Sequence, residues 1–108
     1  MGSERRLYQI FKKKIKETDP NCWVYKIPDW IGGPKRPFDF FLVIKGVPFA
    51  IEFKSKDGML TKYQGYQLLD FTNAGGEALV YWEEKETLNE FVEKIVKSAK
   101  KRLNNKLL

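Results

Sequence analysis

The sequence has no histidine and only one cysteine, Cys22, in a chain of 108 residues. The absence of histidine excludes Ser-His-Asp and Cys-His catalysis, the HNH-type nucleases and most zinc hydrolase sites. A single cysteine cannot form an internal disulfide, so we expect the protein to work in a reducing, cytoplasmic compartment.

The sequence also lacks long apolar runs and is short of acidic residues. No run approaches the roughly 20 apolar residues that span a bilayer, so we expect no membrane association. The first residues, MGSERRLYQIFKKKIKE, are interrupted by charge throughout, which is unlike a signal peptide. Fourteen acidic residues face 20 basic ones, for a net charge of +6. This excess favours an anionic partner such as nucleic acid.

The length and the periodicity predict one α/β domain, residues 1–108. The expected order is α-β-β-β-α-β-α. The elements expected are a helix over 4–17, a strand over 22–27, a hairpin over 37–54, a helix over 61–74, a strand over 77–82 and a helix from 87. A helix joins the third strand to the fourth, which predicts a mixed four-stranded sheet flanked by helices. Ser3 is expected to cap the first helix, and capping boxes begin at Thr61 and Thr87.

The hairpin over 37–54, PFDFFLVIKGVPFAIEFK, organises the rest of the chain. If Lys45-Gly46 is a two-residue turn, the numbers of opposite residues sum to 91, and Asp39 lies opposite Glu52. Lys54 is two residues beyond Glu52 and therefore shares its face of the sheet.

Two adjacent carboxylates repel unless a positive charge lies between them. Asp39 and Glu52 offer the oxygen ligands that Mg²⁺ or Mn²⁺ prefers, and the backbone carbonyl of Phe53 is placed to add a third. Lys54 could orient or deprotonate water, or neutralise charge on a phosphate. The pattern indicates metal-assisted hydrolysis of a phosphodiester. The alternative is an ordinary salt-bridge cluster of these two acids with nearby lysines.

Glu-x-Lys alone is a weak signal, because Glu83-Glu84-Lys85 repeats it at the end of the next strand. That second copy has no acid-bearing hairpin partner. The full set of Asp39, the hairpin, Glu52-Phe53-Lys54 and the capped helix is more specific.

Other candidates lie outside the hairpin. Glu4 shares the helical stripe of Leu7, and it is either a first-turn acid favoured by the helix dipole or a further acid of the metal site. In the loop over 28–37, basic residues and Trp30 either contact a nucleic-acid backbone or belong to a solvated loop whose tryptophan folds onto the core. The residues expected to contact nucleic acid are Lys35, Arg36, Lys56, Lys62 and Arg5.

The set Asp39…Glu52-Phe53-Lys54 resembles the PD-(D/E)xK nuclease signature, although Pro37-Phe38-Asp39 is one residue longer than the strict Pro-Asp. The segments 58–64 (GMLTKYQ) and 75–80 (GGEALV) are similar to the VRR-NUC branch. The segments 4–7 (ERRL) and 52–55 (EFKS) are also similar to archaeal-type Holliday junction resolvases. The resemblance covers roughly residues 4–82.

The resemblance implies a restriction-endonuclease-like core and a Mg²⁺- or Mn²⁺-dependent endonuclease. Asp39 and Glu52, with the Phe53 carbonyl, would bind the metal, and Lys54 would act on the attacking water. Gln64 would orient Lys54 or that water, although the third helical position of a capping box also favours glutamine. Glu4 would touch the metal through water. Small nucleases of this kind often form homodimers that recognise branched, junction or flap DNA.

Two other functions stay open. The first is a non-catalytic nucleic-acid-binding domain that retains the nuclease fold. The second is a basic module that docks on an acidic protein. The tail after Glu93 permits this docking function, because every charged residue in the tail is basic. Such a tail is also typical of a solvated helix face.

Overall fold

The computed structural model describes residues 2–28, 35–55 and 58–107, of which residues 2–4 and 106–107 are described by their backbone alone. The elements follow the expected order along the chain. They are α1 (Gly2–Thr18), β1 (Trp23–Lys26), β2 (Phe40–Ile44), β3 (Val47–Lys54), α2 (Lys62–Asn73), β4 (Glu77–Trp82) and α3 (Leu88–Leu107).

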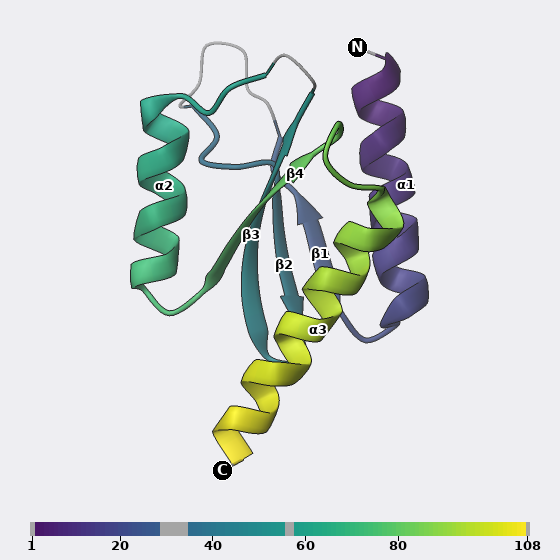
Figure 1. Ribbon diagram of the computed structural model, residues 1–108, viewed down its shortest axis with the longest axis vertical. Coiled ribbons are helices and arrows are strands. Elements are labelled where there is room, and N and C mark those ends of the chain that lie inside the picture. The colour runs from purple at the N-terminus through teal and green to yellow at the C-terminus, as the bar shows by residue number, and fades with distance from the viewer. Residues whose placement is uncertain (1, 29–34, 56–57, 108) are drawn as a thin grey trace.

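The elements form three layers (Figure 1). The four-stranded sheet, in the order β1-β2-β3-β4, lies between α2 on one face and α1 with α3 on the other. Strand β4 is parallel to β3 and the other neighbours are antiparallel, so the predicted α/β fold with a mixed sheet is confirmed. One prediction about α1 was wrong. The helix begins at Gly2, so Ser3 lies inside it and does not precede it as a cap. No described helix is long and apolar enough to cross a bilayer.

The predicted hairpin register is confirmed for the whole of β2. The pairs run from Ile44↔Val47 at the turn to Phe40↔Ile51. Lys45 and Gly46 have φ values of 52° and 77°, as a type I′ turn requires at both central residues. Glycine reaches this left-handed region without strain, which explains why the chain reverses here.

The alternation of side chains along the strands builds two cores of unequal size. Phe40, Leu42 and Ile44 of β2 point toward α1 and α3, where most of the buried apolar residues form one cluster. Between α2 and the opposite face, the second cluster of buried apolar residues in the described chain consists of Phe38, Ala50 and Leu68 of α2 itself. The α2 face is therefore the less completely covered one.

Helix α2 begins with the predicted capping box. The Thr61 hydroxyl accepts a hydrogen bond from the Gln64 backbone, and the Gln64 side chain accepts one from the Thr61 N–H. At its other end the chain turns at Gly75 and passes against the ring of Phe71. A Cβ at Gly76 would lie 2.2 Å from that ring, so only glycine allows this close approach.

Candidate active site

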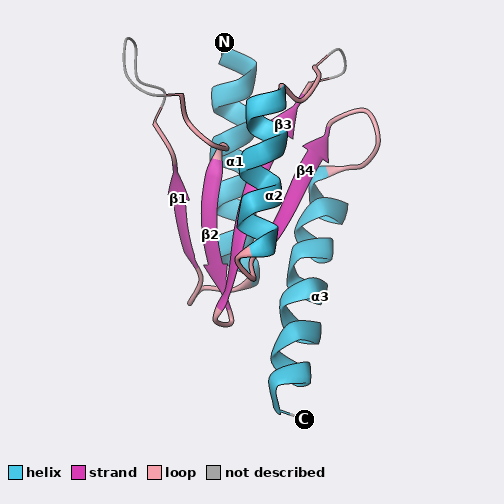
Figure 2. Ribbon diagram, turned by 90° about the vertical axis from the view of Figure 1, so that its left-hand side faces the viewer, coloured by secondary structure: helices cyan, strands magenta, loops and turns pink. Residues whose placement is uncertain are grey.

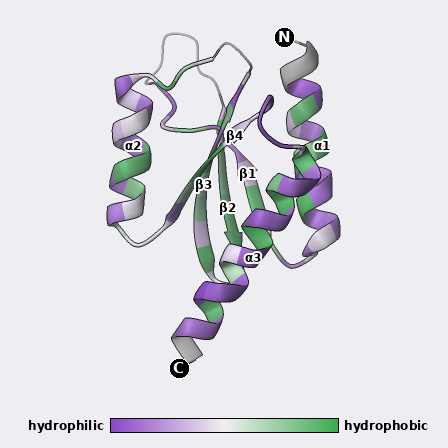
Figure 3. Ribbon diagram, viewed as in Figure 1, coloured by the Kyte–Doolittle hydropathy of each residue, from purple (hydrophilic) through white to green (hydrophobic). Residues whose placement is uncertain are grey.

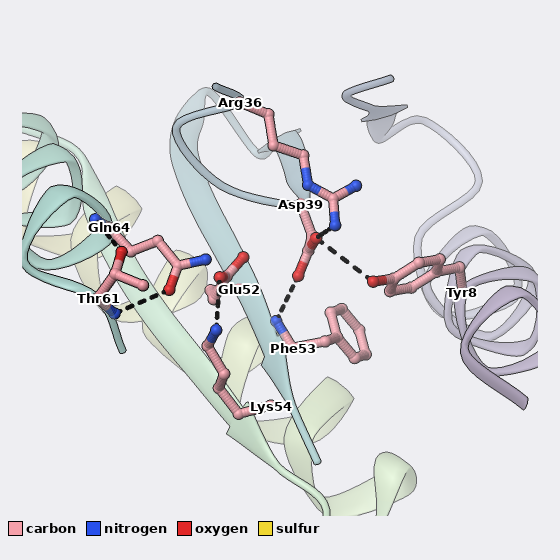
Figure 4. Close-up of polar contacts among 8 residues, drawn as sticks. All are labelled: Tyr8, Arg36, Asp39, Glu52, Phe53, Lys54, Thr61 and Gln64. Carbon is pink, nitrogen blue, oxygen red and sulfur yellow. Dashed lines mark hydrogen bonds and ion pairs between the residues drawn. The ribbon is translucent and has the colours of Figure 1, made fainter. Parts of the chain in front are cut away.

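Two carboxylates are buried where β2 begins and β3 ends (Figure 4). Asp39 directly precedes β2 and Glu52 belongs to β3, and both residues are 2% exposed. They are the buried charged residues of the described part of the chain. Because burying a charge is costly unless it is paired, their location requires an explanation.

The backbone of Asp39 joins three strands. Its N–H donates to the carbonyl of Ile51 (3.0 Å), and its carbonyl accepts from the N–H of Ile27 (2.9 Å). The register of the hairpin would place Asp39 opposite Glu52, yet its N–H bonds the residue before Glu52. A one-residue offset of this kind is what a β-bulge produces, and bulges often re-aim a side chain beside a functional site.

The side chain of Asp39 uses both of its oxygens. Oδ2 accepts a hydrogen bond from the Phe53 N–H at 2.7 Å, in place of a backbone hydrogen bond between the strands. Oδ1 lies 2.8 Å from an Arg36 guanidinium nitrogen and 3.4 Å from the Tyr8 hydroxyl, which donates to it. Asp39 is thus held by β3, by the segment before β2 and by α1 (Figure 4).

Tyr8 is a site residue that the sequence analysis missed. It lies three positions before the fully buried Phe11, so the spacing along α1 contained a signal that it faces the sheet. Arg36 was expected to contact nucleic acid, and the structure places it in an ion pair with Asp39. That pairing ties the basic segment before β2 directly to the carboxylate.

The carboxylate of Glu52 has fewer polar partners than that of Asp39. Its Oε2 lies 3.4 Å from Lys54 Nζ, whereas its buried Oε1 has no hydrogen-bond partner in the described structure. Burial, followed by the hydrogen bond and the charge of the neighbouring Asp39, raises the pKa of Glu52 to about 8 against the opposing effect of Lys54. A protonated Glu52 can share its proton with Asp39, but an ionised Glu52 leaves Oε1 unpaired.

Lys54 and Gln64 approach Glu52 from two elements. The Lys54 side chain is 15% exposed, and its aliphatic part lies under the turn at Gly58. Gln64 extends from the start of α2 toward Glu52 and Lys54 (Figure 4). Its Oε1 accepts from the Thr61 N–H at 3.1 Å, so the capping bond leaves the amide nitrogen as a donor.

The other predicted site residues are not gathered at the carboxylates. Lys35, Lys62 and Arg5 are exposed on the surface. The carbonyl of Lys35 accepts from the Tyr63 hydroxyl at 2.9 Å, which ties the segment before β2 to α2. The side chains of Glu4, Trp30 and Lys56, and with them the predictions for these residues, lie outside the described residues.

The second Glu-x-Lys differs from the first in its surroundings. Glu83 and Glu84 are exposed in the turn after β4. The ammonium group of Lys85 lies over the Trp82 ring, 5.2 Å from its centre. Lys85 therefore has no buried carboxylate beside it, which supports the choice of the hairpin copy as the candidate.

The carboxylate pair fits a hard divalent cation in the chemistry of its donors. The unpaired Oε1 of Glu52 and the adjacent Asp39 supply anionic oxygens, and Mg²⁺ is commonly held by one or two carboxylates while it keeps several waters. The described residues contain no cluster of three or more aspartate, glutamate, cysteine or histidine side chains. With two carboxylates alone, a bound Mg²⁺ would take its remaining ligands from water and other oxygens.

The comparisons with known proteins add no relative to this picture. No protein-family model, no curated protein and no solved structure matches the chain. The assignment of a function consequently depends on the residues of this chain.

Proposed function

We propose that the protein is a divalent-metal-dependent DNA endonuclease of the PD-(D/E)xK type, with a restriction-endonuclease-like core similar to the VRR-NUC branch. The observation that carries the proposal is the buried, unpaired Oε1 of Glu52 beside Asp39 and Lys54. A protein gains nothing in stability from such an oxygen, because leaving a buried acceptor unsatisfied costs about 1–3 kcal/mol. A cation would satisfy it.

Asp39, Glu52 and the Phe53 carbonyl would hold Mg²⁺ or Mn²⁺. When bound, the metal would supply Lewis-acid stabilisation of a phosphate and a lowered pKa for bound water. The Phe53 N–H fixes the orientation of Asp39. Lys54 orients the attacking water and neutralises the negative charge that grows on the phosphate. The amide nitrogen of Gln64 positions Lys54 or that water, and Glu4 would contact the metal through water.

The basic excess of the chain would hold a polyanion over these groups, with contacts from Lys35, Arg36, Lys56, Lys62 and Arg5. The resemblance to small nuclease families supports selection of the target by DNA structure, such as branches, junctions or flaps. Two copies arranged as a symmetric homodimer would cut two strands.

One observation favours the second candidate function, a non-catalytic nucleic-acid-binding domain with the same fold. Each carboxylate already has a cation within the chain, Arg36 at 2.8 Å for Asp39 and Lys54 at 3.4 Å for Glu52. Such a protein would bind DNA in a salt-dependent manner without cleaving it or taking up metal.

The test is cleavage of plasmid and branched DNA in Mg²⁺, in Mn²⁺ and in EDTA. We expect cleavage with either metal and none in EDTA. Lys54→Ala should lower the rate by about 10²–10³-fold, because it removes a group that stabilises transition-state charge. Lys85→Ala is the matched control from the second Glu-x-Lys and should leave the rate unchanged.

Two outcomes would reject the nuclease. The first is the absence of cleavage in both metals. The second is a Lys54→Ala variant as active as the wild type. Salt-sensitive DNA binding in the absence of cleavage, with no Mn²⁺ bound per chain by metal analysis, would establish the binding domain instead.

A further inference from the structure

Two aromatic side chains are exposed side by side on the edge strand β1. Trp23 is 52% exposed and Tyr25 is 47% exposed, although both lie in a regular strand. Their rings are stacked, with centres 5.7 Å apart and planes 13° from parallel. The Phe41 ring meets Trp23 edge-on at 5.5 Å, so the pair is held in place from β2. We name Trp23, Tyr25 and Phe41 the aromatic platform.

The platform lies on the same face of the sheet as Glu52 and Lys54. The register gives one row of neighbours, Tyr25–Phe41–Ala50. Glu52 is two residues beyond Ala50 on β3, so it projects from the same face about 7 Å further along the strand. Lys54 follows by the same step. One pleat of the sheet therefore separates the aromatic row from the row that contains Glu52.

Helix α2 leaves this part of the face open. Figure 2, which looks toward α2, shows β1 beside the helix and not behind it. Phe71 of α2 contacts the platform at Phe41, with 5.9 Å between the ring centres. The helix thus covers the inner edge of the platform and leaves Trp23 and Tyr25 in solvent.

The charges around the platform indicate which kind of ligand it would bind. The rows Trp23–Val43–Pro48 and Tyr25–Phe41–Ala50 contain no charged residue. The cations Arg36 and Lys54 lie beside the two carboxylates, beyond the end of these rows. Flat aromatic rings beside a cationic border are the features that bind single-stranded nucleic acid, with bases on the rings and phosphates near the cations.

We infer that the aromatic platform binds the bases of an unpaired DNA segment next to the site of cleavage. This inference rests on the proposed function and specifies its substrate class: DNA with a single-stranded region on the β1 side of the scissile phosphate. Duplex DNA keeps its bases stacked inside the helix and cannot use the platform. The platform would thereby favour a flap or an opened branch over continuous duplex.

Binding in EDTA tests the inference without cleavage. The probes are a labelled oligothymidylate and an abasic strand of the same length, which carries the same phosphates and no bases. Fluorescence polarisation should show tighter binding of the oligothymidylate to the wild type. Trp23→Ala and Tyr25→Ala should each weaken that binding by roughly 5- to 100-fold and leave abasic binding unchanged.

Two variants control for effects other than stacking. Trp23→Phe keeps a ring and should retain most of the oligothymidylate affinity. Tyr66→Ala removes another exposed tyrosine, on the side of α2 opposite the buried Leu68, and should change neither probe. Equal binding of the two probes by the wild type, or equal weakening of both probes in Trp23→Ala, would overturn the inference.

The remaining occupant to test is a second copy of this chain, bound through the same rings. A dimeric wild type that becomes monomeric in Trp23→Ala, with oligothymidylate binding unchanged, would assign the platform to that contact and overturn the inference. A protein that cleaves DNA but does not distinguish the two probes would leave the nuclease in place and remove the platform alone. A protein whose oligothymidylate binding depends on the rings but that never cleaves DNA would keep the platform and reject the nuclease.

Discussion

The two faces of the sheet differ in how they are covered and in what they contain. The face under α1 and α3 buries Phe11, Phe40, Phe53 and Phe91 in the main cluster of the core. The α2 face has a small buried cluster, the candidate site and the exposed platform. Colouring by hydropathy shows hydrophilic and hydrophobic bands alternating along α3 (Figure 3). One face thus contributes most of the buried core, while the other leaves more of its side chains exposed.

The unequal cover follows from the helices. Helix α3 has 20 residues and α2 has 12. Of the residues of α2, only Leu68 is buried. A helix with so narrow an apolar side contributes little to the stability of the fold. The residues beneath it are therefore less constrained by core packing. The predictions below compare the two faces.

The largest effect is expected from removing an aromatic ring from the main core. Phe40 and Phe41 are adjacent in β2 and point to opposite faces, and Phe40 is 1% exposed. Phe40→Ala should lower the free energy of unfolding by about 3–5 kcal/mol, as is typical of a fully buried phenylalanine. Phe41→Ala, on the open face, should cost roughly 1–2 kcal/mol. Urea denaturation measures both.

Phe40→Leu provides the same comparison if Phe40→Ala does not fold. It keeps most of the apolar volume and should still cost more than Phe41→Leu. Equal losses in the two positions would show that the faces stabilise the fold equally, and the division of roles between them would be wrong.

The next effect, of a few kcal/mol, is expected from the ionisation of Glu52 in EDTA. Burial and then the Asp39 carboxylate raise the pKa of Glu52 to about 8 in the folded protein, from an ordinary value of 4.5. The folded state therefore binds the proton more tightly than the unfolded one. This stability is fully present below pH ~4.5 and is lost as the pH rises through about 8.

Glu52→Gln removes that dependence and should make the metal-free protein more stable than the wild type at pH 9, measured by urea denaturation. Glu84→Gln, at an exposed position after β4, should leave the difference between pH 5 and pH 9 unchanged. Added Mg²⁺ should stabilise the wild type and not Glu52→Gln. A wild type whose stability does not fall between these two pH values would contradict the burial of an ionisable Glu52.

The sequence was sufficient for the elements and for most of the hairpin. The turn residues Lys45-Gly46 set the register, and the alternation of side chains along β3 placed Glu52 and Lys54 on one face. Local signals, a turn that needs positive φ and the capping box at Thr61, were enough for this because each depends on neighbouring residues.

The surroundings of Asp39 could not be predicted in the same way. Its offset bond to Ile51 and its contact with Tyr8 depend on how distant segments meet, and strand alternation does not describe a bulge. Alternation along a strand implies that Trp23 and Tyr25 share a face, but it does not show that both side chains stay exposed beside α2. The cover of a sheet depends on the packing of helices, which is a property of the whole fold.

The smallest effect separates the two roles of Gln64 on the open face. Gln64→Glu keeps an oxygen that accepts from the Thr61 N–H, so the free energy of unfolding should change by less than about 0.5 kcal/mol. It also replaces the amide nitrogen by an acceptor, so DNA cleavage should fall roughly 5- to 10-fold if that nitrogen orients Lys54 or water. Thr61→Ala is the matched control: it should lower stability by about 1 kcal/mol and leave the cleavage rate of the folded protein unchanged. A Gln64→Glu variant with full activity would restrict Gln64 to capping α2.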